Sequence, residues 1–209
     1  MTHARGERTA LCDLLDRLGP DEPTLCTGWT TADLAAHLAI RERRLDAAPG
    51  LALKPLAGYT ASVQNRLKTR LPYPELVGLV RSPGGVYALL PALDEAVNTL
   101  ELFVHHEDVR RAQPDWEPRA LPDDLERLIW KRVSGGARLM LRRSPVGVVL
   151  HRLGGGIALG GPKGGARVEV TGRAAELLMF CFGRQAHARV ELTGEPDAVS
   201  ALREATLGV

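Results

Sequence analysis

The amino-acid sequence predicts an α+β protein, in which an up-and-down bundle of about four helices precedes a small α/β domain with one sheet. In the first 113 residues, apolar side chains recur at three- and four-residue spacings, which is the periodicity of helices. A proline- and acid-rich stretch, PDWEPRALPDD, follows. Beyond Pro145, β-branched runs alternate with glycines, which is typical of strands and turns. We therefore expect a helical domain at 1–113 and an α/β domain at 114–209.

The helical domain contains several segments separated by prolines and glycines. Thr30-x-x-Asp33 has the form of a capping box at the start of the second helix. In the loop before it, Trp29 is expected to anchor the chain against the bundle, because aromatic side chains dominate local packing. Four of the predicted helices span residues 3–18, 55–70, 75–80 and 91–113, and one more begins at Thr30. The chain is either continuous or kinked at Pro91.

The segment from Pro91 to Gln113 reads as one amphipathic helix, opened by Pro91 and closed by Pro114. Its apolar residues form a stripe that we expect to face the core: Leu93, Val97, Leu100 and Val104. A second stripe beside it carries polar side chains: Asp94, Asn98, Glu101, His105 and Asp108. The helix therefore places possible metal ligands next to its predicted buried face.

Glu101 and His105 are four residues apart, so their side chains lie one above the other on the helix. A carboxylate and an imidazole in this arrangement can supply two ligands of a metal site, and an exposed Glu–His pair is the alternative. His37 lies at the edge of the apolar stripe of the second helix, where it is a third candidate ligand or a half-buried histidine that donates to a carbonyl. His106 points 100° away from His105, so we expect it at the surface or in support of the site.

The second domain begins with a helix at 121–141. Its predicted strands lie in VGVVLHRL, GGGIALGG, ARVEVTG and 188–192, and its later helices are 174–182 and 195–205. The glycines of LGGGIALGGPKGG favour tight hairpin turns. A phosphate-binding loop is not indicated, because Lys163 is followed by Gly164 and then by a strand rather than by a helix.

Composition excludes several classes of protein. Hydrophobic residues make up 44% of the 209 residues, too many for a disordered chain, and the net charge of +2 is not that of a dedicated nucleic-acid binder. The three cysteines, Cys12, Cys26 and Cys181, are far apart and indicate neither a disulfide framework nor a thiolate zinc site. Because no signal peptide or long apolar segment is present, we expect a cytoplasmic protein that does not bind membranes.

Two stretches resemble the mycothiol-dependent maleylpyruvate isomerase family. CTGWTTADLAAHL is similar to its first signature, in which Gly-Trp precedes a helix ending in Asp-Leu-x-x-His-Leu, and ELFVHHEDV is similar to its second, Glu-x-x-x-His followed by an acidic residue. The resemblance implies a DinB-like four-helix bundle that holds a divalent ion, followed by a sterol-carrier-like α/β domain. Differences around HHEDVRR and RERRLDAAPG point to an actinobacterial branch of the family rather than to the isomerase itself.

Carried over residue by residue, the resemblance implies that His37, Glu101 and His105 bind the metal, usually zinc. Three protein ligands leave a fourth position open, as in catalytic zinc sites. Mycothiol is the implied thiol cofactor, acting with a small electrophilic substrate in an isomerase or S-transferase reaction. Asp108 or Asp33 would orient a ligand imidazole, and Arg184 would hold an acidic substrate or the cofactor.

The residues leave a second function open, in which the protein is a non-catalytic metal sensor or a partner-binding module. We expect it to be a monomer or a homodimer. The ligand set does not select zinc over iron or nickel, because all three accept imidazole and carboxylate.

Overall fold

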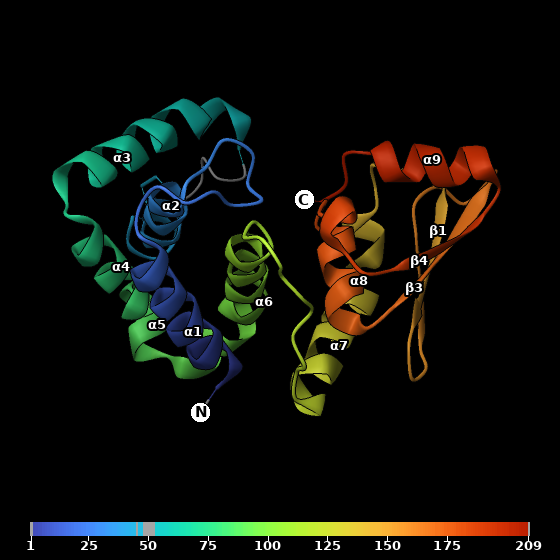
Figure 1. Ribbon diagram of the computed structural model, residues 1–209, viewed down its shortest axis with the longest axis horizontal. Coiled ribbons are helices and arrows are strands. Elements are labelled where there is room, and N and C mark those ends of the chain that lie inside the picture. The colour runs from blue at the N-terminus through green and yellow to red at the C-terminus, as the bar shows by residue number, and fades with distance from the viewer. Residues whose placement is uncertain (1, 45, 48–52, 209) are drawn as a thin grey trace. The chain divides into compact units, whose positions relative to one another are not determined.

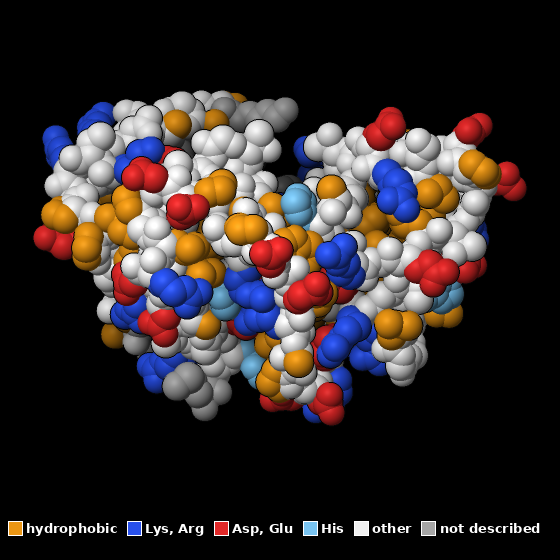
Figure 2. All heavy atoms as spheres, in the orientation of Figure 1, with side chains coloured by type: hydrophobic (Ala, Val, Ile, Leu, Met, Phe, Trp, Pro, Cys, Tyr) orange, Lys and Arg blue, Asp and Glu red, His pale blue; other side chains and the backbone are white. Residues whose placement is uncertain are grey.

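The structure, a computed structural model, describes residues 2–44, 46–47 and 53–208. The chain divides into two compact units, Met1–Glu117 and Pro118–Val209 (Figure 1). The first is helical and the second combines helices with one four-stranded sheet, so the predicted α+β class is confirmed. Within the described part of the chain, no helix has the length and apolar character needed to cross a membrane. On the face shown in Figure 2, acidic and basic side chains are interspersed.

Unit 1 is built around a core to which four helices contribute. Leucines, valines and alanines from α1, α2, α4 and α6 fill this core, and α3 packs on α2 beside a smaller cluster that contains Ile40 and Val63. The elements are α1 (His3–Leu18), α2 (Thr31–Arg43), η2 (Lys54–Leu56), α3 (Ala57–Arg70), α4 (Tyr73–Arg81), α5 (Gly85–Leu89) and α6 (Pro91–Arg110).

The stretch before α6 contains a break. α5 ends at Leu89, and Leu90 has φ −124° and ψ 84°, outside the helical region. The ring of Pro91 disfavours helical geometry in the residue before it, which explains why α6 starts afresh there. At its other end α6 stops at Arg110, three residues short of the predicted Gln113.

The buried face of α6 differs from the prediction. Leu93 and Val97 are 36% and 40% exposed, so the expected apolar stripe does not face the core along the first half of the helix. Asp94 and Asn98 are buried there instead. Buried polar groups persist where each finds a partner, and both side chains are hydrogen-bonded. The interior of the bundle is therefore ionic on this side.

The loop between α1 and α2 is held at several points. The capping box is confirmed: the Thr30 side chain accepts from the backbone of Asp33, and the Asp33 carboxylate accepts from the backbone N–H of Thr30. Trp29 packs against the core, as predicted. The backbone N–H of Leu25 donates to the carbonyl of Asp108 at 3.0 Å, which ties the loop directly to α6.

Unit 2 is a four-stranded sheet with helices packed against it. The strand order is β2-β1-β3-β4, in which β1 and β3 are parallel and the two outer pairs are antiparallel. The elements are α7 (Asp123–Met140), β1 (Gly147–Arg152), β2 (Ile157–Gly160), β3 (Arg167–Gly172), α8 (Ala174–Cys181), η3 (Gln185–His187), β4 (Glu191–Gly194) and α9 (Pro196–Glu204). The last strand thus begins three residues later than the predicted 188–192.

One face of this sheet is apolar and covered. The buried Val148, Leu150, Val168 and Val170 alternate with less buried residues along β1 and β3, and α7 and α8 pack side by side within the unit (Figure 1). Glycines at 154–156 connect β1 to β2 with positive φ angles of 88°, 103° and 118°, which confirms a hairpin turn at this point.

Candidate metal centre

Three side chains predicted to bind metal lie together in unit 1. His37 comes from α2, and Glu101 and His105 come from α6. The Oε1 atom of Glu101 lies 3.6 Å from Nε2 of His37 and 3.3 Å from Nε2 of His105. One ligand atom from each residue lies within 4.8 Å of the other two. The i, i+4 spacing on α6 and the packing of α2 against the same core bring them to one point.

These distances fit a tetrahedral ion. With Zn–N and Zn–O bonds near 2.1 Å, two ligands of a tetrahedral zinc lie ~3.4 Å apart. The two N–O distances in the structure differ from this ligand-to-ligand distance by about 0.2 Å or less. Two imidazoles and a carboxylate therefore occupy positions that one small divalent ion can bridge.

The surroundings of His37 also fit a bound metal ion. Both of its ring nitrogens are buried, and neither has a hydrogen-bond partner among the residues that the structure describes. Trp29 packs beside the ring, with centroids 5.0 Å apart, and the ring of His105 lies 5.2 Å away. A buried nitrogen without a partner is costly. An ion at Nε2 would remove that cost.

His105 is held from its other side. Its Nδ1 atom lies 3.0 Å from Oδ2 of Asp108, which is fully buried, and the thiol of Cys26 donates to the same oxygen at 3.3 Å. Burial lowers the pKa of His105, but hydrogen bonds with Asp108, Cys26 and Glu101 outweigh it and raise the pKa well above its usual value. Asp108 therefore fixes the orientation of the ring, as carboxylates do for metal-bound histidines.

The other two candidate ligands respond differently to burial. Burial raises the pKa of Glu101, but its interactions with the nearby His105 and His37 rings outweigh burial and hold the pKa well below its usual value. Burial is the main cause that lowers the pKa of His37. The carboxylate is thus ionised and His37 is neutral near pH 7, which are the protonation states that bind metal.

Arg41 also reaches Glu101. It lies one turn after His37 on α2, and its Nε atom is 3.3 Å from the same Oε1 atom. Its Nη1 atom donates to the side chain of Asn98. The guanidinium therefore shares the carboxylate oxygen with the two histidines.

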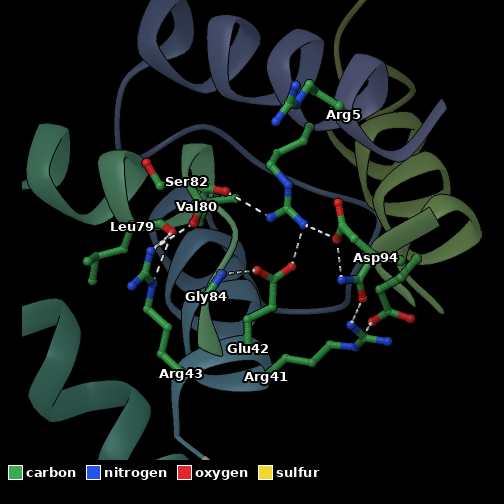
Figure 3. Close-up of polar contacts among 12 residues, drawn as sticks. Arg5, Arg41, Glu42, Arg43, Leu79, Val80, Ser82, Gly84 and Asp94 are labelled. Atoms are coloured by element: carbon green, nitrogen blue, oxygen red, sulfur yellow. Dashed lines mark hydrogen bonds and ion pairs between the residues drawn. The ribbon is translucent and has the colours of Figure 1, made fainter. Parts of the chain in front are cut away.

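A buried ionic network continues from Asn98 to Asp94 and Glu42 (Figure 3). Asn98 donates to Asp94 at 2.7 Å, and Arg8 donates to Asp94 and to Glu42, each at 2.8 Å. Glu42 also accepts from the backbone of Gly84 at 3.0 Å. This network joins α1, α2 and α6 through charged hydrogen bonds and thereby fixes the helices that carry the candidate ligands.

Other predicted residues lie elsewhere. Asp33 caps α2 and pairs with Lys68, so it does not orient a ligand. His106 is buried and pairs with Glu7 at 2.8 Å, so the surface alternative was wrong, and its role in support of the site stays a prediction. Arg184 lies in unit 2, where its Nη1 atom donates to the carbonyl of Phe182 at 2.6 Å.

Sequence reasoning missed two neighbours of the site, Cys26 and Arg41. Cys26 is a lone cysteine in a loop, 79 residues from His105, and no spacing rule connects them. Arg41 had a usable signal, because it follows His37 by four residues and so lies on the same face of the helix.

Comparison with known proteins was made at the level of sequence and of structure. No protein-family model and no curated protein matches the sequence. Two solved structures share the fold. One is the crystal structure of the mycothiol-dependent maleylpyruvate isomerase, with a TM-score of 0.59 and 17% identity over 92% of this chain and 91% of that chain. The other is a histidine-to-alanine mutant of that isomerase, with a TM-score of 0.56 and the same identity and coverage.

Proposed function

We propose that this protein binds a divalent metal ion, zinc in the first instance, through His37, Glu101 and His105, and uses it to activate a small-molecule thiol. The observation that carries the proposal is the convergence of both Nε2 atoms on one oxygen of Glu101, at 3.6 and 3.3 Å. The fold shared with a mycothiol-dependent enzyme supports mycothiol as the thiol.

The chain's own residues have distinct parts in this function. His37 supplies a neutral imidazole, and Glu101 supplies the negative charge that compensates a divalent ion. Asp108 holds His105 so that its Nε2 atom faces the other two ligands. Bound metal would stabilise the thiolate form of the thiol, which is the nucleophile at neutral pH.

The proposed reaction is isomerisation or S-transfer on a small electrophile. Arg184 is proposed to bind an acidic substrate or the cofactor, because a guanidinium binds carboxylates through two parallel hydrogen bonds. Replacement of Arg184 by alanine is then expected to raise KM more than it lowers kcat. An unchanged KM would exclude Arg184 from substrate binding.

Metal binding is tested first, by elemental analysis of the purified protein. We expect about one equivalent of divalent metal in the wild type, the stoichiometry of a mononuclear site. His37→Ala, Glu101→Gln and His105→Ala are each expected to lose most of it. His151→Ala, which replaces a histidine of unit 2, is the matched control and keeps the metal. Retention of metal by all three site variants would refute the site.

Turnover is tested separately, by following the consumption of mycothiol in the presence of a chlorodinitro-arene. The proposal requires a rate that falls on removal of the metal and returns when the metal is restored. The alternative outcome is a protein that carries the metal but shows no thiol-dependent turnover with a panel of electrophiles. That result would favour the non-catalytic metal sensor or partner-binding module.

A further inference from the structure

His105 has two ring nitrogens, and each faces a different set of possible ligands. Nε2 faces Glu101 and His37, as described above. Nδ1 lies 3.0 Å from Oδ2 of Asp108 and 4.0 Å from Sγ of Cys26, and this sulfur lies 3.3 Å from the same carboxylate oxygen. A sulfur, a nitrogen and an oxygen thus form a second compact triangle on the opposite side of the ring.

We propose that Cys26, His105 and Asp108 form a second metal position that is selective for thiophilic ions. With bonds of about 2.3 Å to sulfur and 2.1 Å to nitrogen and oxygen, a tetrahedral ion places these ligands ~3.6 Å apart for the sulfur pairs and ~3.4 Å apart for the nitrogen–oxygen pair. The three measured separations each lie within about 0.4 Å of these values. Small shifts of these three side chains would therefore bring their ligand atoms to bonding distance of one ion.

The ligand set determines the class of ion. Thiolate sulfur favours soft and borderline ions such as Cd²⁺ and Zn²⁺, whereas the site at His37 offers only nitrogen and oxygen. Binding requires the thiol of Cys26 to lose its proton and Nδ1 of His105 to be unprotonated, and both protons go to solvent. Cys26 is partly exposed, so an ion can approach from the side of the loop.

The two positions exclude one another under ordinary conditions, since both depend on His105. An imidazole that coordinates through Nδ1 keeps its remaining proton on Nε2, where the hydrogen bond to Glu101 replaces coordination. The protein would then hold a hard or borderline ion at one position or a thiophilic ion at the other. The second position does not depend on the proposed thiol chemistry.

The test is a Cd²⁺ titration of the full-length, metal-stripped protein, followed by the ultraviolet sulfur-to-cadmium charge-transfer band. We expect the wild type to show the band and Cys26→Ser to lose it. His37→Ala should keep the band, because it changes only the other position. Cys12→Ala is the matched cysteine control and should also keep it, since Cys12 is fully buried and its pKa is raised to about 12 by burial.

Two results would overturn the proposal. The first is a wild-type protein without a charge-transfer band at saturating Cd²⁺, which would leave Cys26 and Asp108 as hydrogen-bonding supports of His105 alone. The second is a band that survives in Cys26→Ser. Failure of the first metal site looks different, because a wild type that binds no Zn²⁺ through His37 can still show the cadmium band.

Discussion

Oδ2 of Asp108 lies 3.0 Å from Nδ1 of His105, on the side of the ring opposite to Glu101. The carboxylate is fully buried and belongs to the same helix as the histidine, three residues further on. The orientation of His105 is therefore built into α6 itself. Its consequences can be measured.

Asp108→Asn is expected to weaken metal binding about 10- to 100-fold, because an amide orients the imidazole less strongly and does not favour one tautomer. The measurement is a competition titration of Zn²⁺ against a chromophoric chelator. Asp33→Asn, which replaces a carboxylate on α2 outside the site, serves as the control and keeps wild-type affinity. Equal affinities of wild type and Asp108→Asn would show that Asp108 does not position His105.

Arg41→Gln is expected to tighten metal binding about tenfold, because the guanidinium occupies the Glu101 oxygen at 3.3 Å and repels a nearby cation. The same competition titration measures the change, at low and high salt. Arg43→Gln is the control, since Arg43 lies on the same helix but donates to the carbonyls of Leu79 and Ser82 (Figure 3). Weaker binding by Arg41→Gln would mean that Arg41 holds Glu101 in place for the ion.

Arg8→Ala is expected to lower the free energy of unfolding by about 3–5 kcal/mol, because it leaves the buried carboxylates of Glu42 and Asp94 without their shared cation. Urea unfolding followed by circular dichroism measures this loss. Arg5→Ala, at an exposed position on the same helix, should change stability by less than about 0.5 kcal/mol. Similar losses in the two variants would contradict the importance of the network.

Asp33→Asn is expected to cost up to about 1 kcal/mol of stability at pH 7, since the neutral amide loses the ion pair with Lys68 and the negative charge in the first turn of α2. Burial raises the pKa of Asp33, but hydrogen bonds from Lys68 and Thr30 outweigh it and lower the pKa below its usual value. A carboxyl group with a lowered pKa in the folded protein stabilises it above the unfolded pKa, and this contribution disappears as the pH falls through the folded pKa.

The difference between wild type and Asp33→Asn should therefore be constant near neutral pH and shrink below about pH 4. Urea unfolding at several pH values measures it. Asp21→Asn, which replaces an exposed carboxylate in the loop before α2, provides the comparison. A difference that grows on acidification would reverse the proposed sign.

Local patterns predicted most of the fold. Helical spacing located the helices, glycine clusters located the hairpin of unit 2, and Thr30 with Asp33 marked the start of α2. Local patterns failed on α6, where Leu93 and Val97 suggested a buried face that the tertiary structure leaves half exposed. Arg8 of α1 pairs with Asp94 on the buried side of α6, and no periodicity within α6 could predict that partner.

In the candidate site, too, local patterns predicted some residues, and others depend on tertiary contacts. The spacing of Glu101 and His105 predicted their proximity, and His37 was a candidate from its position on the second helix and from a stretch that resembles a family signature. Cys26 was not, because its proximity to His105 depends on the loop being tied to α6 through Leu25 and Asp108. Such contacts between distant segments arise from packing rather than from sequence spacing.

The polar interior of α6 also affects how the bundle assembles. In its first half, α6 buries the polar side chains of Asp94 and Asn98 rather than apolar ones, so the hydrophobic effect contributes little to holding this half against the bundle. An isolated peptide of residues 91–110 therefore has little reason to become helical on its own. α6 is stabilised by the contacts of its Asp94 and Asn98 with Arg8 of α1 and Arg41 of α2. These three helices should therefore form together in a single cooperative step.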